Sequence, residues 1–224
     1  MINKLPKWVE VGGFFLALCA GAINAIGLLG FKHQAVSHLT GTSTFLALEI
    51  AQSNIGEILH LLGVIASFVG GAAFSGLLIG NTALKLGRRY SLALIIESLL
   101  LLISMWFLNN NSSSGQFFAS AACGLQNAMT STFSGAVVRT THVSGLFTDL
   151  GVIFGLKLRG HAIDKRRVIL YFILIAGFIV GGVVGAISFD QLRFSAMLFP
   201  AALSALLALG YWIYWYFSSM RESS

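Results

Sequence analysis

The sequence is short of charged residues, prolines and cysteines. Of its 224 residues, 14 are Lys or Arg, 8 are Asp or Glu, and only two each are proline and cysteine. So few charges exclude a disordered chain, and two cysteines, Cys19 and Cys123, exclude a disulfide scaffold and indicate packing residues. A hydrophobic fraction of 56% is also too high for a soluble enzyme. We therefore predict an integral membrane protein whose immediate partner is the lipid bilayer.

The sequence also lacks the motifs of common enzymes. No P-loop, GxSxG, HExxH or dinucleotide fingerprint stands in a suitable context. We predict no cofactor, no metal site and no enzymatic activity. The net charge of +6 would suit nucleic acid in a soluble protein, but here Lys and Arg gather in short loops between apolar runs, where they set membrane orientation. No nucleic-acid partner is predicted.

Long apolar runs predict an all-α membrane protein. Each is long enough for a helix across a ~30 Å hydrocarbon core. Two further segments are shorter and rich in Ser, Thr, Gly and His, and their path through the membrane decides the topology. The long runs are about 9–31, 58–80, 90–108, 116–138, 168–188 and 194–217, and the short segments are 35–50 and 141–156.

Loop charge distinguishes six crossings from eight. If both short segments cross, Lys and Arg divide 8 inside to 6 outside, which is almost no bias. If neither crosses, the division is 12 to 2, with only Lys32 and Arg193 outside. The positive-inside rule favours the second arrangement. We predict six transmembrane helices in the bacterial inner (plasma) membrane, with both termini cytoplasmic.

An internal repeat relates the two halves of the single domain 1–224. SHLTGTSTFL (37–46) resembles THVSGLFTDL (141–150), GAINA (21–25) resembles GLQNA (124–128), and VGG at 69–71 recurs at 180–182. Repeat one covers about 9–108 and repeat two about 116–217. Three crossings per half make the repeat inverted, so the short segments enter as re-entrant half-helices from opposite sides and meet near the middle of the bilayer.

Small and aromatic residues predict packing and membrane interfaces. Small-xxx-small spacing indicates close helix crossings at Gly76, Gly80, Gly177, Gly181 and Gly185. Aromatic residues near the inner ends of the spans are typical of an interfacial belt. They include Trp8, Tyr90, Tyr171 and the cluster Tyr211, Trp212, Tyr214, Trp215 and Tyr216.

Repeat-equivalent polar residues are the first candidates for a solute site. His38 and His142 are each followed by a hydroxyl residue and a glycine, so that free amides of a helix N-terminus can bind an anion or a carbonyl oxygen. The alternative is that both histidines only brace the fold. The other candidates in equivalent positions are Thr40 and Ser144, and Asn24 and Asn127, whose amides alternatively serve as interhelical contacts.

Three charged residues complete the candidates. Arg139, at the start of the second short segment, can bind an anion or simply adds to the inside charge. Asp149 has no acidic counterpart in the first half and is a candidate for proton or ion coupling, or a structural partner of Arg139. Glu97 lies mid-span without a polar sequence neighbour, so it must face the interior, carry a proton or pair across helices.

The segment VRTTHVSGLFTDLG (138–151) preceded by GLQNA, with AGAINAIGLLG and HLTGTST in the first half, resembles the YoaK-like family of small bacterial inner-membrane proteins of unknown function. The resemblance covers nearly the whole chain and implies a membrane fold but no activity. The family commonly carries an acidic residue where this chain has Asn24. If that carboxylate serves ion or proton coupling in relatives, the resemblance implies that this protein couples differently or not at all.

The leading functional hypothesis is a transporter or channel for an unknown small solute, with its site between the two half-helices. The alternative is a membrane scaffold or sensor without flux, and a third interpretation is an intramembrane enzyme that uses Glu97 or Asp149 with histidine. The chain is also compatible with a homo-oligomer.

Overall fold

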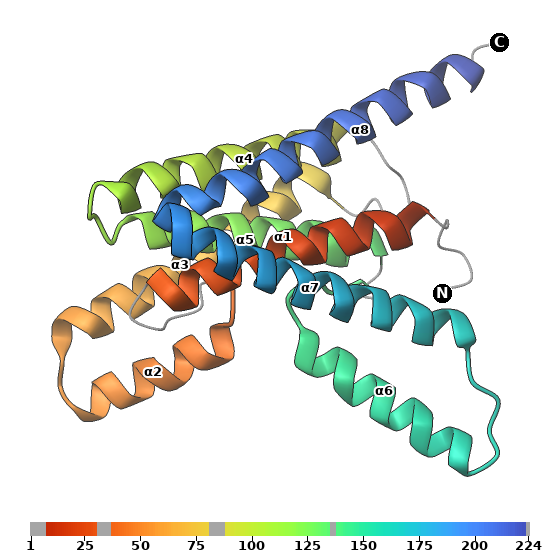
Figure 1. Cartoon of the computed structure of the whole chain (residues 1–224), viewed down its shortest axis with the longest axis horizontal. Coiled ribbons are helices and arrows are strands. Elements are labelled where there is room, and N and C mark those ends of the chain that lie inside the picture. The colour runs from red at the N-terminus through yellow and green to blue at the C-terminus, as the bar shows by residue number, and fades with distance from the viewer. Residues whose placement is uncertain (1–7, 31–36, 81–87, 135–137, 223–224) are drawn as a thin grey trace.

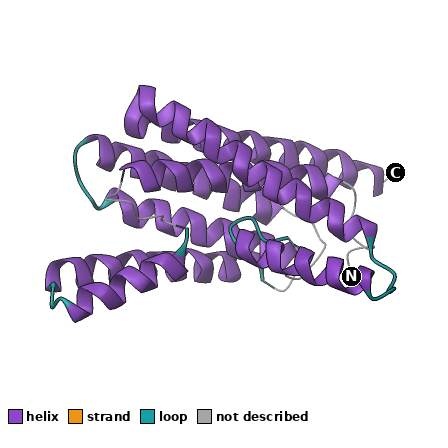
Figure 2. Cartoon of the chain, turned by 60° about the horizontal axis from the view of Figure 1, so that its bottom comes forward, coloured by secondary structure: helices purple, strands orange, loops and turns teal. Residues whose placement is uncertain are grey.

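The computed structural model describes residues 8–30, 37–80, 88–134 and 138–222, and these residues form helices without any strand (Figures 1 and 2). Predicted positions 31, 35, 36 and 135–137, and the basic residues Lys4, Lys7, Lys32 and Lys85, lie outside the described residues. The helices are α1 (Trp8–Gly30), α2 (Leu39–Ala51), α3 (Ile55–Ile79), α4 (Arg88–Asn109), α5 (Gly115–Ser134), α6 (Val143–Leu158), α7 (Lys165–Leu192) and α8 (Leu198–Glu222), with a 3₁₀ turn, η2 (Arg193–Met197).

Within the described residues, four helical segments have the length and hydropathy to cross a membrane: Trp8–Gly30, Ile55–Ile79, Arg88–Asn109 and Lys165–Tyr216. The prediction of an all-helical membrane protein is thereby confirmed. The last segment, 52 residues long, contains α7, η2 and most of α8. The chain turns at η2, where Arg193 has a positive φ of 51°. The predicted fourth run, 116–138, forms α5 but is not among these segments.

The closest helix crossing is made twice, and each time it joins a helix of the first half to a helix of the second. A Cβ added at Gly21 of α1 would overlap the Phe178 carbonyl of α7, and one at Gly181 would overlap the Leu18 carbonyl. In the other pair, Gly124 of α5 meets the Phe68 carbonyl of α3, and Gly71 meets that of Ala121. Only glycine permits backbones to approach so closely. The pairs α1–α7 and α3–α5 therefore have the same contact geometry.

The crossing corrects part of the predicted alignment. Gly181 lies 110 positions after Gly71, one fewer than the offset of the VGG match, because these two glycines make the equivalent contacts. Gly177 and Gly185 also meet α1, at the carbonyls of Phe14 and Ala22, as predicted. The prediction for Gly76 and Gly80 is wrong. An added Cβ would meet no neighbour at either, and Gly80 ends α3 with a φ of 63°.

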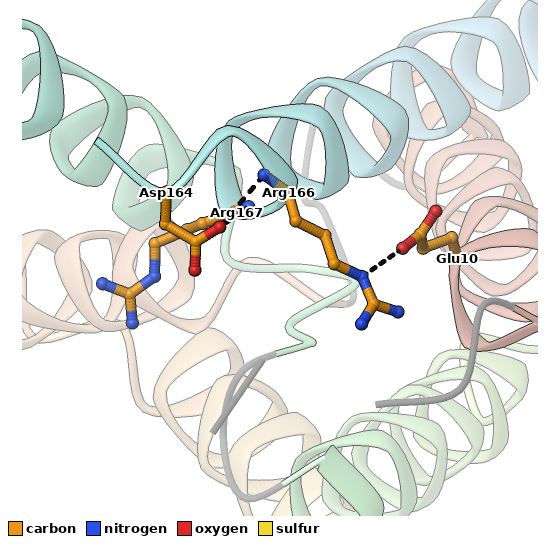
Figure 3. Close-up of polar contacts among 4 residues, drawn as sticks. All are labelled: Glu10, Asp164, Arg166 and Arg167. Atoms are coloured by element: carbon orange, nitrogen blue, oxygen red, sulfur yellow. Dashed lines mark hydrogen bonds and ion pairs between the residues drawn. The ribbon is translucent and has the colours of Figure 1, made fainter. Parts of the chain in front are cut away.

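Polar contacts fix the start of α7 (Figure 3). Asp164 caps the helix by accepting hydrogen bonds from the backbone amides of Arg166 at 3.0 Å and Arg167 at 3.3 Å. The Arg166 Nε donates to Glu10 Oε1 at 2.9 Å, which joins α7 to the first turn of α1. The basic loop before α7 is therefore attached to the beginning of the chain's first described helix.

Candidate functional site

The two short helices begin near the middle of the molecule and run toward opposite ends, α2 beside α3 and α6 beside α7 (Figure 1). His38 precedes α2 and His142 precedes α6 as the N-cap residue, and neither imidazole caps its helix. The His142 ring interacts electrostatically with His38 and with Arg139. The two histidines, one from each half, are thus close enough to interact electrostatically, and both residues are exposed.

The first turn of each short helix contains a glycine under a cationic or ionisable side chain. The His38 ring lies over Gly41, and its Cδ2 would be 3.0 Å from an added Cβ. At the equivalent Gly145, the nearest group is instead Nη1 of Arg139, 3.7 Å from such a Cβ. Arg139 therefore reaches over the N-terminal turn of α6, where its guanidinium can meet an anion bound to the helix amides.

Thr40 and Ser144 lie one residue into the helices, and their side chains are exposed. Their carbonyl oxygens accept equivalent hydrogen bonds, from Thr44 Oγ1 and Thr148 Oγ1, both at 3.0 Å. The matching hydroxyl residues of the two repeats therefore form the same hydrogen bonds in α2 and α6. Both predicted hydroxyls lie close in sequence to the histidine that precedes their helix.

The two asparagines of the repeat have different surroundings. Asn24 of α1 accepts a hydrogen bond from Ser37 Oγ at 2.8 Å, directly before His38, and so links the long helix to the short one. Asn127 of α5 is buried, and its side-chain carbonyl oxygen has no partner among the described residues. Its neighbour Gln126 donates to the Leu16 carbonyl at 3.2 Å and joins α5 to α1. The side-chain carbonyl oxygen of Asn24 therefore accepts a hydrogen bond, whereas that of Asn127 accepts none from the described residues.

The asparagine pair leads to an asymmetric stability prediction. Asn24→Leu is expected to lower the free energy of unfolding by about 1–3 kcal/mol because it leaves the buried Ser37 hydroxyl without its acceptor. Asn127→Leu is expected to leave it unchanged or raise it by up to about 1 kcal/mol, because the change removes a buried carbonyl oxygen that has no hydrogen-bond partner among the described residues. Unfolding in detergent micelles, followed by circular dichroism, measures both. Equal losses in the two variants would contradict the difference.

Asp149 forms its hydrogen bond with a neighbouring helix. Its Oδ2 accepts from the Tyr171 hydroxyl of α7 at 3.0 Å, and Tyr171 also interacts electrostatically with Arg139 and Arg167. The corresponding residues of the first half are Phe45, by the short-segment match, and Leu61, by the offset of the helix crossing. The hydrogen-bonded pair Asp149 and Tyr171 of the second half therefore corresponds to two apolar residues in the first. Sequence had singled out Asp149 but not its partner Tyr171.

Glu97 lies apart from the half-helices, in α4. Its side chain is 0% exposed, and neither carboxylate oxygen has a hydrogen-bond partner among the described residues. The nearby groups that interact with it are the Ser204 hydroxyl of α8 and the thiols of Cys19 and Cys123. The prediction that Glu97 faces the interior is confirmed. Both cysteines are free and buried, as expected for packing residues.

An aromatic pocket was not predicted from the sequence. It has a cavity volume of about 40 Å³ and lies between α1, α4, α5 and α8. Trp8 contacts Phe133 and Tyr211 with ring centroids 5.6 and 5.9 Å apart, and Phe133 contacts Tyr90 at 5.4 Å. Trp8, Tyr90 and Tyr211 had been interpreted as interfacial belt residues, and Phe133 had not been singled out. They come from four distant parts of the chain, so no local spacing could group them. Lining residues are Trp8, Val9, Gly13, Leu16, Tyr90, Met129, Thr130, Phe133, Val138 and Tyr211.

Comparison with known proteins gives a family but no activity. Residues 12–210 match the family described as "Protein of unknown function (DUF1275)". This agrees with the resemblance to YoaK-like proteins of unknown function. No curated protein and no solved structure matches the chain.

Proposed function

Because the chain belongs to the DUF1275 family of proteins of unknown function, we propose its function from its geometry: a membrane protein that passes a small solute between two half-helices. The observation that carries the proposal is the arrangement of two short helices that diverge toward opposite ends of the molecule. Their N-cap residues, His38 and His142, lie close enough to interact electrostatically. Irregular backbone at membrane depth is tolerated where it is enclosed by protein or lines a wet cavity. Channels and secondary transporters often build their sites in this way.

The helix directions support six crossings by α1, α3, α4, α5, α7 and α8. The start of α1, the end of α8 and the α6–α7 connection lie toward one end of the molecule, and the α2–α3, α4–α5 and α7–α8 turns lie toward the other (Figure 1). The first end carries the basic group Lys157, Arg159, Lys165, Arg166 and Arg167. The positive-inside rule makes it the cytoplasmic end of an inner-membrane protein.

An inverted repeat is supported by the duplicated crossing. The α1–α7 contact corresponds to the α5–α3 contact at equivalent glycines, while the pairs α4–α8 and α1–α5 join corresponding helices of the two halves. A two-fold axis in the membrane plane produces this set of contacts, because it exchanges α1 with α5 and α3 with α7. It also exchanges α2 with α6, so that their N-termini meet at the axis.

The chemistry of the junction favours a small solute with an anionic or carbonyl oxygen. Two helix N-termini supply amide donors and positive dipole ends, and Arg139 adds a guanidinium over the first turn of α6. Asn24, Thr40, Asn127 and Ser144 are the neighbouring polar residues that we assign to the same path. Asp149, bonded to Tyr171, gives the cytoplasmic half a proton or cation acceptor that the outer half lacks.

Flux through vesicles tests the proposal. Protein reconstituted into liposomes is assayed with a panel of small anions and neutral carbonyl compounds, by isotope uptake or light scattering. For a solute that crosses, His142→Ala is expected to slow uptake about tenfold, the effect of losing one hydrogen bond of about 1.4 kcal/mol. Asp149→Asn is expected to slow it as well. His161→Ala, an exposed histidine in the α6–α7 loop, is the matched control and leaves uptake unchanged.

A scaffold or sensor without flux gives a different result in the same experiment. The His142 and Asp149 variants then lower the melting temperature in detergent while no solute crosses the vesicle membrane. Uptake that is equal in wild type and in both variants contradicts the site assignment.

A further inference from the structure

The four helices that pair across the proposed axis enclose a polar cluster in the core. It consists of Glu97 of α4, Ser204 of α8, Cys19 of α1 and Cys123 of α5, each no more than 1% exposed. Cys19 Sγ lies 3.7 Å from Ser204 Oγ and donates to the Pro200 carbonyl at 3.7 Å. These contacts occupy the serine and one thiol with each other. The Ser204 hydroxyl also interacts with Glu97, but neither carboxyl oxygen has a partner with hydrogen-bond geometry among the described residues.

An isolated carboxylate at this position cannot remain charged in the enclosed state. The groups that interact with it are the two thiols and the Ser204 hydroxyl of the fourth helix, and no cation from the described part of the chain interacts with it. The cost of burying an unpaired ionised carboxylate far exceeds that of holding a proton. The cluster also lacks a metal-binding set, since the described residues contain no group of three His, Cys, Asp or Glu side chains suited to a metal ion. The ligand that fits is a proton.

The aromatic pocket lies two helical turns from this cluster. Tyr90 and Glu97, Thr130 and Cys123, and Tyr211 and Ser204 are each seven residues apart. Seven residues place two side chains on the same helix face, about 10 Å apart along the axis. On α4, α5 and α8, the helix face that lines the pocket therefore continues to the level of Glu97.

Polar groups lie on the helix faces to either side of Glu97. Toward the pocket, Thr130 donates to the carbonyls of Gln126 and Asn127, and the Gln126 Oε1 has no partner among the described residues. Beyond Glu97 in α4, Leu101 belongs to a hydrophobic cluster, but Ser104, seven residues after Glu97 on the same helix face, is 0% exposed and donates to the Gly115 carbonyl at 2.8 Å. Polar groups therefore lie on both sides of Glu97, and the aromatic pocket lies on one of them.

We propose that Glu97 is a proton-binding site, on the helix faces that lead to the cytoplasmic aromatic pocket and separate from the half-helix junction, and that its proton is coupled to solute transport. The inference rests on the proposed function for its orientation and its solute. In this conformation the carboxyl group holds its proton. Release of H⁺ leaves a carboxylate. It therefore requires a second conformation in which water or a hydrogen-bond donor contacts that carboxylate.

Labelling with dicyclohexylcarbodiimide tests the site without a solute. A protonated carboxyl group adds its O–H across a C=N bond of this apolar reagent, and rearrangement gives a stable acylurea with no leaving group. Full-length protein in detergent is labelled and digested, and the adduct is located by mass spectrometry. We expect the adduct at Glu97, with labelling that decreases at alkaline pH. Asp149→Asn and His142→Ala are expected to retain it, since both residues lie outside the core.

Infrared difference spectra across a pH titration provide the second measurement. The carbonyl stretch of a buried carboxylic acid is expected in wild type, absent in Glu97→Gln, and shifted in Ser204→Ala, which removes the neighbouring hydroxyl while keeping the acid. The Ser204 variant keeps the test valid if Glu97→Gln does not fold. A folded wild type without a Glu97 adduct at any pH, or a carbonyl band that persists in folded Glu97→Gln, overturns the proposal. Absence of solute flux with these signals intact contradicts only the proposed transport.

Discussion

Alanine at Gly181 is expected to lower the free energy of unfolding by about 1–3 kcal/mol. Its Cβ would overlap the backbone of Leu18, which no change of rotamer can relieve, so α1 and α7 must separate. At the adjacent Gly182, an added Cβ would lie 3.8 Å from the Gly21 carbonyl oxygen, an ordinary contact. Gly182→Ala is expected to leave stability unchanged or raise it by up to about 1 kcal/mol, because alanine favours the helix.

The α3–α5 crossing allows the same comparison at a second, independent contact. Gly71→Ala would place a Cβ on the Ala121 backbone, whereas Gly70→Ala meets no neighbour. Unfolding of the four variants in detergent, followed by circular dichroism, should therefore separate Gly71 and Gly181 from Gly70 and Gly182. Similar stabilities within each adjacent pair would show that the crossing tolerates a methyl group and that the two close contacts are not its structural basis.

Replacement of Glu97 by methionine is expected to raise the free energy of unfolding by about 1–3 kcal/mol, the usual cost of a buried polar group without a partner. Methionine has a similar shape and removes both unbonded oxygens. The same change is expected to abolish proton-coupled uptake. Stability and function therefore move in opposite directions, as expected when a polar group is kept in a core for its chemistry.

A surface acid provides the control for this result. Glu49, near the end of α2, accepts a hydrogen bond from Asn54 Nδ2 at 2.9 Å in an exposed position. Glu49→Met is expected to change stability by less than about 0.5 kcal/mol. Thermal unfolding of both variants distinguishes a core effect from a general effect of added apolar surface. A strong loss of stability in Glu97→Met would contradict the model of an unbonded carboxyl group.

Most helices were predictable because hydropathy reports burial in lipid directly. The predicted segments 58–80 and 90–108 differ from α3 and α4 by only a few residues. The short segments were also located correctly, since 35–50 and 141–156 correspond to α2 and α6. Their position was visible in the pattern of hydroxyl residues and glycine after His38 and His142. That pattern marks helix starts, which are determined locally.

The remaining features depend on which faces of distant helices meet. Spacing alone could not show that Gly76 faces no helix while Gly181 touches a backbone, because both belong to small-xxx-small patterns. Likewise, Glu97 has no polar neighbour in sequence, and its neighbour Ser204 comes from a helix more than a hundred residues later. Tyr171 could not be assigned to Asp149 before α6 was seen beside α7.

The polarity of α5 has a consequence for how the protein is made. Its buried face includes Gln116, Ser120, Gln126, Asn127 and Thr130, and it is the one proposed crossing that lies outside the segments with sufficient hydropathy. The free energy of transfer into lipid is too weakly favourable for such a helix to enter the bilayer without a partner helix. It is joined to the strongly apolar α4 by residues 110–114, and Ser104 donates to the Gly115 carbonyl at 2.8 Å. If both helices cross the membrane as proposed, we expect α4 and α5 to enter the bilayer as one hairpin during synthesis, because the apolar α4 favours insertion of the pair.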